Sequence, residues 1–240
     1  MKHAGGAIVP HSVVAIVPAA GLGRRFGHDR NKPFETLGGK PVIVWALETL
    51  EHMAEVREII PVLKESDIRV GMELASRYGI TKIRSVAPGG RERQDSVFNA
   101  LHFIREKPQV ILIHDGVRPF FDRRNVMQAL QVLADCDGVV IGVPPKDTIK
   151  EMDGDIIQQT LKRDALISVQ TPQIFWHQPL LNAYERAMQE SFYATDDAAL
   201  VEWNGGRIRV IRGGYTNIKV TTPEDLVVAE AFLKMRGDGQ

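Results

Sequence analysis

The first apolar run of the chain ends in a glycine turn that is followed by basic residues. Val13–Pro18 is the run, Gly21 and Gly23 come after it, and Arg25 and Lys32 lie shortly beyond. Glycines let the backbone approach a ligand closely and present N–H groups to it, and the two cations add mobile positive charge. This combination predicts a phosphate-binding loop suited to a triphosphate. Taken alone, a strand, a glycine turn and solvated basic residues are the alternative interpretation.

The glycine spacing excludes two common nucleotide-binding loops. Gly21 and Gly23 are followed by Gly27, one place too late for the dinucleotide pattern Gly-x-Gly-x-x-Gly, and no Gly-Lys-Ser/Thr follows as in a Walker loop. Hydride transfer and ordinary ATPase chemistry are therefore not favoured. Phosphoryl and nucleotidyl transfer need mainly positioning and charge stabilisation, which cations at a phosphate can supply.

A second candidate group follows the apolar run Val110–His114. Asp115 comes directly after this run, and Arg118 lies three residues later. An acid at a strand end can hold a divalent metal or order a substrate hydroxyl, and an arginine can pair with a phosphate. For Asp115 alone, an N-cap or turn role is the alternative. We expect His114 to be a packed or turn residue, because no second His or Cys lies at metal-site spacing.

A third group opens a predicted helix. Gly89 and Gly90 lead into a segment whose first helical turn carries Ser96. This arrangement places backbone amides and a hydroxyl where a base or a ribose can bind. A purely structural helix entry is the alternative.

The last candidates lie in the second half of the chain. Lys219 is flanked by apolar residues in a predicted strand, Asn217–Val220, where alternation places it on one face. A solvated surface lysine is the alternative. Arg163, Thr171 and Thr195 complete this group, and Thr195 is also a candidate N-cap for the helix that follows it.

Short apolar runs alternate with helical patterns along most of the chain. This alternation predicts right-handed βαβ units, a mainly parallel sheet flanked by helices, and ligand binding at the carboxyl ends of the strands. We expect one α/β domain of the Rossmann-like, nucleotidyltransferase type over residues 1–240. The expected strands are Val13–Pro18, Glu58–Val62, Lys82–Val86, Val110–His114, Gly138–Pro144, Arg207–Ile211 and Asn217–Val220. The expected helices are Pro41–Met53, Asp67–Tyr78, Arg93–Arg105, Asn125–Leu133, Gln178–Glu190, Ala198–Trp203 and a last one opened by Thr222 and Pro223.

The alternation of strand and helix patterns is interrupted after Pro145. Asp153-Gly154 lies between two β-rich runs, which is a strong signal for a β-hairpin. Such a hairpin does not join a parallel sheet easily, so residues 146–168 are predicted to form a projecting arm. Because an isolated hairpin is marginal in water, we expect the arm to pack on a second subunit.

Composition limits the class of protein. The chain has 240 residues, 30 basic against 30 acidic side chains, and a single cysteine, Cys136. The balanced charge gives no support to a nucleic-acid or membrane-surface role. One cysteine excludes an intrachain disulfide and fits a reducing compartment. No segment has the roughly 18 to 20 apolar residues of a membrane span, and the interrupted N-terminal run does not fit a signal peptide. We expect a cytoplasmic protein.

Seven motifs in this order resemble one family, the 2-C-methyl-D-erythritol 4-phosphate cytidylyltransferases of the non-mevalonate isoprenoid pathway. The resemblance runs from Val14 to about Leu233. The motifs are Pro18–Arg25, Gly90–Val97, His114–Pro119, Lys146–Lys150, Thr171–Gln173, Thr195-Asp196 and Asn217–Leu226.

The resemblance implies an enzyme that joins CTP to methylerythritol phosphate, releases pyrophosphate and requires Mg²⁺. The substrate phosphate would attack the α-phosphorus of CTP directly. Arg25 and Lys32 match residues that stabilise the transition state, and Arg163 and Lys219 match those that position the incoming phosphate. The positions that match nucleotide contacts are Pro18, Ala19, Ala20, Gly21, Gly23, Gly90 and Ser96. Those that match the surroundings of the methylerythritol phosphate are Asp115, Arg118, Thr148, Thr171 and Thr195, with Asp115 also the candidate metal ligand. The arm would clasp a partner in a homodimer and serve its neighbour's site.

Two departures from the family pattern lie near the predicted site. Pro33 follows Lys32 where the family usually has glutamine, which removes a backbone donor and predicts an extended conformation at Lys32. Gly116 stands where alanine is frequent.

Three rival functions share some of these features. A sister cytidylyltransferase acting on ribitol 5-phosphate would share the fold, CTP and the metal, but it more often has Leu-Ala-Gly-Gly where this chain has Pro18–Gly21. A catalytically silent nucleotide-binding module would not require Arg25, Lys32, Arg163 and Lys219 together. A nicotinamide dehydrogenase is the weakest rival, because of the glycine spacing.

Overall fold

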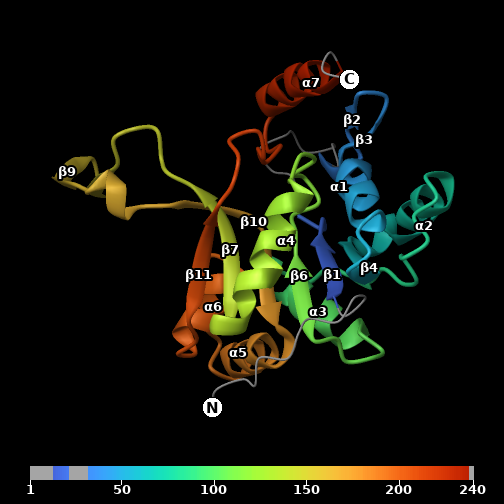
Figure 1. Ribbon diagram of the computed structural model, residues 1–240, viewed down its shortest axis with the longest axis horizontal. Coiled ribbons are helices and arrows are strands. Elements are labelled where there is room, and N and C mark those ends of the chain that lie inside the picture. Colours follow the sequence, from blue (N-terminus) through green and yellow to red (C-terminus); the bar gives the residue numbers. More distant parts are fainter. Residues whose placement is uncertain (1–12, 22–31, 238–240) are drawn as a thin grey trace.

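A seven-stranded sheet forms the centre of the computed structural model, which describes residues 13–21 and 32–237. The strand order is β11-β7-β10-β6-β1-β4-β5 (Figure 1). All neighbouring pairs are parallel except the two that involve β10. The strands are β1 (Val13–Pro18), β4 (Val56–Leu63), β5 (Ala87–Pro88), β6 (Val110–Ile113), β7 (Gly138–Val143), β10 (Ser168–Trp176) and β11 (Ile208–Arg212). The predicted α/β fold with a mainly parallel sheet is confirmed.

Helices cover both faces of the sheet, which explains why β1 is buried throughout. Val13, Ala15 and Val17 contribute to one core cluster, and Val14 and Ile16 to the other. The first cluster includes side chains of α1 (Val42–Glu51), α2 (Ile68–Arg77) and α4 (Arg123–Val132). The second includes those of α3 (Arg93–Phe103), α5 (His177–Gln189) and α6 (Asp197–Trp203). None of the helices in the described part of the chain is both long and apolar enough to cross a bilayer.

The C-terminal helix α7 (Pro223–Gly237) packs against a small hairpin formed by β2 (Thr36–Leu37) and β3 (Lys40–Pro41). Gly38 N donates a 2.8 Å hydrogen bond to the carboxylate of Glu230. Gly38 has a φ of +56° and packs against the side chain of Leu233, so the turn favours glycine. As predicted, Thr222 caps α7, accepting from Asp225 N at 3.4 Å.

The predicted hairpin forms in the arm and projects from the body of the molecule (Figure 1). β8 (Lys150–Asp153) pairs antiparallel with β9 (Ile156–Thr160), and the turn contains Gly154 at a φ of +59°. Every residue of both strands is exposed, including Met152, Ile156 and Ile157. The arm therefore presents apolar side chains that no part of residues 13–21 and 32–237 covers.

Two predicted strands are wrong. Lys82–Val86 forms only one isolated bridge, Ile83 to Ile59, and the strand lies later, at β5. Asn217–Val220 is irregular, because the carbonyl of Asn217 and the N–H of Val220 bind the loop after β6 instead of pairing with the backbone of a neighbouring strand.

β10 was not predicted. It contains Gln170, Thr171, Pro172 and Gln173, which interrupt any apolar run. The side chains of Gln170, Thr171 and Gln173 are nevertheless buried, and they form hydrogen bonds with Asn217, Asp115 and Asp196 respectively.

Candidate active site

A cavity of about 800 Å³ opens at the carboxyl ends of the parallel strands. It lies among the segments that follow β1, β4, β5 and β6 and includes part of the connection that leads to α7. Of the predicted site residues, those that line it are Pro18, Ala19, Ala20, Gly21, Lys32, Gly90, Ser96, Asp115 and Lys219. Residues far apart in the sequence therefore meet where the fold class predicts a ligand.

The segment after β1 is held close to its neighbours. Ala19 N donates to Val62 O at 2.8 Å, and Gly116 N donates to Pro18 O at 3.0 Å. A Cβ on Gly116 would lie 3.1 Å from the Cβ of Ala19, so glycine eases the close approach of the two loops. Gly23 and Arg25 lie outside the described residues.

Lys32 begins a 3-10 turn, Lys32–Phe34, in which Glu35 N donates to Lys32 O at 3.2 Å. The extended conformation expected at Lys32 is therefore wrong. Pro33 is buried in this turn and needs no N–H donor there, so proline is accommodated while Lys32 lines the cavity.

Ser96 shapes the glycine loop that forms another wall of the cavity. Its hydroxyl accepts from Gly90 N at 3.0 Å and donates to Glu92 O at 3.0 Å. A Cβ on Gly90 would lie 2.3 Å from that of Asp95, so the loop fits closely over the first turn of α3. Ser96 thus fixes the loop, and a contact with nucleotide stays a prediction.

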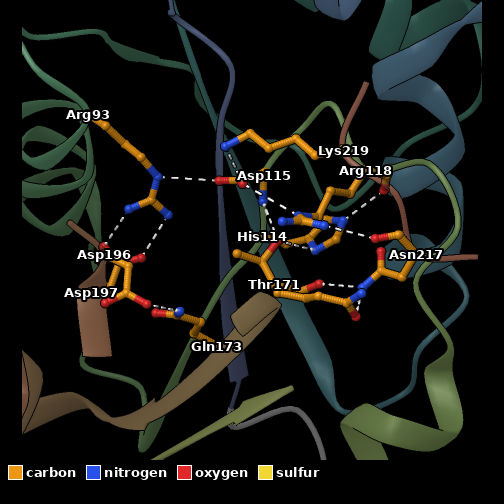
Figure 2. Close-up of polar contacts among 11 residues, drawn as sticks. Arg93, His114, Asp115, Arg118, Thr171, Gln173, Asp196, Asp197, Asn217 and Lys219 are labelled. Atoms are coloured by element: carbon orange, nitrogen blue, oxygen red, sulfur yellow. Dashed lines mark hydrogen bonds and ion pairs between the residues drawn. The ribbon is translucent and has the colours of Figure 1, made fainter. Parts of the chain in front are cut away.

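Asp115 is buried beneath three cations (Figure 2). Its Oδ1 lies 3.3 Å from Nε of Arg93, and its Oδ2 lies 2.9 Å from Nζ of Lys219 and 3.6 Å from Nε of Arg118. Burial alone would raise the pKa of the Asp115 carboxyl, but these cations outweigh it and hold the pKa well below its usual range. Asp115 is therefore ionised at neutral pH.

Arg118 and Thr171 support Asp115 from outside the cavity lining. Arg118 Nη1 donates to Asn217 O at 2.8 Å, and Thr171 Oγ1 accepts from Asp115 N at 3.0 Å (Figure 2). Thr171 Oγ1 also lies 3.1 Å from Nδ1 of His114. As predicted, His114 is a packed residue, and burial lowers its pKa from 6.5 to about 4.

The comparisons with known proteins decide the family. The family model described as IspD, 2-C-methyl-D-erythritol 4-phosphate cytidylyltransferase, matches residues 13–235. The chain belongs to this family. The resemblance drawn from the sequence motifs is thereby confirmed.

Relatives and solved structures of the IspD family match this chain over nearly its whole length. A 2-C-methyl-D-erythritol 4-phosphate cytidylyltransferase of Geotalea uraniireducens is 43% identical over 225 residues, covering 92% of this chain and 97% of that protein. The crystal structure of 4-diphosphocytidyl-2C-methyl-D-erythritol synthase from Anaerococcus prevotii has a TM-score of 0.83 at 32% identity, covering 92% and 96% of the two chains. A cytidylyltransferase structure from Thermus thermophilus has a TM-score of 0.76 at 27% identity, covering 94% and 100%.

Like Arg118 and Thr171, three further predicted site residues do not line the cavity of their own chain. Thr148 and Arg163 lie exposed on the arm, where Arg163 Nη1 donates to Lys146 O at 2.9 Å. Thr195 is exposed before α6, and it is not the N-cap of that helix. Asp196 takes that position, because its longer carboxylate accepts from Ala199 N at 2.9 Å.

Arg93 and Asp197 are site residues to which the sequence reasoning assigned no role. Arg93 lines the cavity and binds both Asp115 and the buried Asp197, which lies 104 residues away in the sequence. Two adjacent acids before an apolar helix, Asp196 and Asp197, predict only a cap. No spacing within one sequence indicates that the second acid faces an arginine on α3.

The described residues contain no group of three or more His, Cys, Asp or Glu side chains placed to hold a metal ion. Asp115 is an ionised carboxylate at the cavity, yet both its oxygens already face cations. Mg²⁺ commonly binds through one or two carboxylates together with water and substrate phosphates. The residues present fit an ion of that kind, one that takes most of its ligands from a bound triphosphate and water.

Proposed function

We propose that this chain transfers a cytidylyl group from CTP to 2-C-methyl-D-erythritol 4-phosphate, giving 4-diphosphocytidyl-2-C-methyl-D-erythritol and pyrophosphate. One observation carries the proposal for this chain. Lys32, Lys219 and Asp115 meet in one large cavity at the carboxyl edge of the sheet, within a chain that matches the IspD family from residue 13 to residue 235. In this cavity, lysines can bind phosphates, and the buried carboxylate of Asp115 can accept hydrogen bonds from sugar hydroxyls.

The proposed reaction is direct attack of an acceptor phosphate oxygen on the α-phosphorus of CTP, with pyrophosphate as the leaving group. The segments Pro18–Gly21 and Gly90–Ser96 bind and orient the nucleotide. Lys32, with Arg25, stabilises the negative charge that develops around the α-phosphorus. Lys219 holds the acceptor phosphate beside Asp115. Positioning and charge of this kind are sufficient for phosphoryl-group chemistry.

The proposed cofactor is Mg²⁺. Asp115 is the residue that would hold it, together with oxygens of the substrate phosphates. Bound there, the ion would supply charge neutralisation for the triphosphate. The cations Arg93, Lys219 and Arg118 keep Asp115 deprotonated at neutral pH, the form that a metal ion requires, and the ion would compete with them for its oxygens.

The proposed assembly is a homodimer formed through the arm, residues 146–168, in a cytoplasmic setting. The exposed apolar side chains Met152, Ile156 and Ile157 support it, since a two-stranded hairpin has little stability by itself. Thr148 and Arg163 are then contributed to the partner's cavity. This arrangement accounts for their distance from the cavity of their own chain.

The test is pyrophosphate release from purified protein with CTP and Mg²⁺, offering methylerythritol phosphate and ribitol 5-phosphate in parallel. ATP, GTP and UTP serve as nucleotide controls. Release only with CTP and methylerythritol phosphate is expected. Release with ribitol phosphate instead would assign the chain to a different acceptor, and CTP binding without release would indicate a silent nucleotide-binding module.

A further inference from the structure

Asp197 is a carboxylate buried where an unpaired charge would be costly. Its side chain is 1% exposed, at the first residue of α6. Both guanidinium ends of Arg93 bind it, Nη1 to Oδ1 at 3.0 Å and Nη2 to Oδ2 at 2.7 Å, and the hydroxyl of Tyr184 on α5 donates to Oδ1. Bidentate pairing of this kind fixes the plane of a guanidinium. Asp197, which Figure 2 shows paired with Arg93, and Tyr184 therefore anchor Arg93 from the helices α6 and α5.

The anchored guanidinium also directs its Nε–H toward the carboxylate of Asp115. Arg93 Nε lies 3.3 Å from Oδ1 of Asp115, the only oxygen of that carboxylate that Arg93 contacts. Oδ2 faces Lys219 and Arg118 instead. Because both Nη atoms are bound to Asp197, Arg93 cannot turn to grip both oxygens of Asp115.

We propose that Asp197 is a positioning residue for the transfer reaction. It holds Arg93 in an orientation that gives Asp115 a single guanidinium contact and leaves Oδ2 to Lys219. This inference rests on the proposed cytidylyl transfer but concerns Asp197, which lies outside the cavity lining. Without the Asp197 carboxylate, the guanidinium of Arg93 is free to pair side-on with Asp115 and displace Lys219 from the place where it meets the acceptor phosphate.

Asp196 provides a matched control next to Asp197 in the sequence. Its carboxylate accepts from Gln173 Nε2 at 2.7 Å and from Ala199 N, and it caps α6 without contacting Arg93. Since asparagine is also a favoured N-cap, Asp196→Asn keeps the cap and loses only the hydrogen bond from Gln173 Nε2. Asp196→Asn and Asp197→Asn thus remove the same charge from adjacent positions, and only the second breaks the bidentate pair with Arg93.

The experiment measures kcat and KM for both substrates in wild type, Asp197→Asn and Asp196→Asn. Asp197→Asn is expected to lower kcat/KM for methylerythritol phosphate about 10- to 100-fold, in the range seen when a supporting residue is lost, with a much smaller change in KM for CTP. Asp196→Asn should stay within about twofold of wild type, as expected for a change away from the reacting groups. Equal effects of the two variants would overturn the inference.

A double-mutant cycle separates positioning from general damage. If Asp197 acts through Arg93, Asp197→Asn should change kcat/KM by less than about twofold in an Arg93→Gln background, because interacting residues are not additive. A loss of the same size in that background as in wild type would overturn the inference.

Tyr184→Phe removes only the hydroxyl that binds Asp197, and it tests the same inference if Asp197→Asn does not fold. It should raise KM for the acceptor in wild type but not in Arg93→Gln, and equal rises in both would contradict the inference. An inactive wild type would refute the proposed function itself.

Discussion

The ammonium of Lys219 lies 2.9 Å from Oδ2 of Asp115, and both residues line the cavity. Lys219 belongs to an irregular segment that is tied to the Asp115 loop on both sides. Val220 N donates to Val117 O at 2.9 Å, and Asn217 O accepts from Arg118. A cation and an anion are thus fixed side by side at the point where an acceptor with a phosphate and several hydroxyls would need both.

Lys32→Ala is expected to lower turnover about 10²- to 10³-fold, as for the loss of one preorganised electrostatic donor. The affinity for CTP should change much less, because the charge matters most as the transition state forms. Arg25→Ala should behave in the same way. The measurement is kcat together with CTP binding. Lys234→Ala, on the exposed side of α7, is the charge-matched control. Near wild-type turnover in Lys32→Ala would show that its assigned role is wrong.

Asn217→Ala is expected to destabilise the protein by about 1 to 3 kcal/mol, the usual cost of leaving buried polar groups unpaired. Asn217 is 4% exposed, and its Nδ2 donates to Thr171 O at 2.8 Å and to Gln170 Oε1 at 3.2 Å. The free energy of unfolding in urea is the measurement. Asn182→Ala, on the exposed face of α5, should change it by less than about 0.5 kcal/mol. A similar small effect at Asn217 would refute this account of the segment.

The folded protein is expected to lose stability on acidification, because the imidazole of His114 has a lowered pKa. In the unfolded chain the pKa of the imidazole is near 6.5, whereas burial lowers this pKa to about 4 in the folded protein. The unfolded state therefore binds more protons between these values, and acid favours it. At about 1.36 kcal/mol per pKa unit, the imidazole removes about 2 kcal/mol of stability at about pH 5.

His114→Gln removes this titration while keeping an N–H near Arg118 O. Urea unfolding at about pH 7.5 and about pH 5 should show a smaller loss of stability on acidification in the variant than in wild type, by about 2 kcal/mol. Other titrating groups contribute equally to both proteins. The same loss in variant and wild type would contradict the depressed pKa of His114.

Deleting residues 148 to 161 is expected to give a monomer, because it removes the exposed apolar hairpin proposed to join two chains. Light scattering gives the mass in solution. A stable, active dimer of the shortened chain would refute the role of the arm.

Mixed dimers test whether Arg163 serves the partner's cavity. Lys219→Met and Arg163→Ala chains with different tags are each expected to be inactive and, purified as mixed dimers, to recover about half of wild-type activity, because one site of each pair then holds neither substitution. No recovery would mean that Arg163 acts within its own chain.

The sequence predicts those parts of the fold that have a strong local pattern. The apolar runs of β1, β6 and β7 were found within a residue or two, because strands buried on both faces read as continuous apolar runs. β10 was not predicted, because polar residues interrupt its apolar pattern. Its buried Gln170, Thr171 and Gln173 are satisfied by side chains brought together only by the tertiary structure.

The candidate site likewise contains residues that the sequence predicts and residues that it does not. Gly90, Ser96 and Asp115 follow strands or open a helix, so the fold class alone brings them to the same edge of the sheet. Arg93 and Asp197 form a pair across two helices, and each has an ordinary local explanation, as a first-turn basic residue and an acid at a helix start. The arm residues Thr148 and Arg163 depend on a second chain, which no local pattern places.

The most direct measurement is phosphorus NMR of the wild-type protein with CTP, Mg²⁺ and methylerythritol phosphate whose phosphate carries oxygen-18. Direct attack predicts a new diphosphate product in which the labelled oxygen bridges the two phosphorus atoms, alongside unlabelled pyrophosphate. Hydrolysis of CTP without a bridged product, or label found in the pyrophosphate, would contradict cytidylyl transfer by this chain.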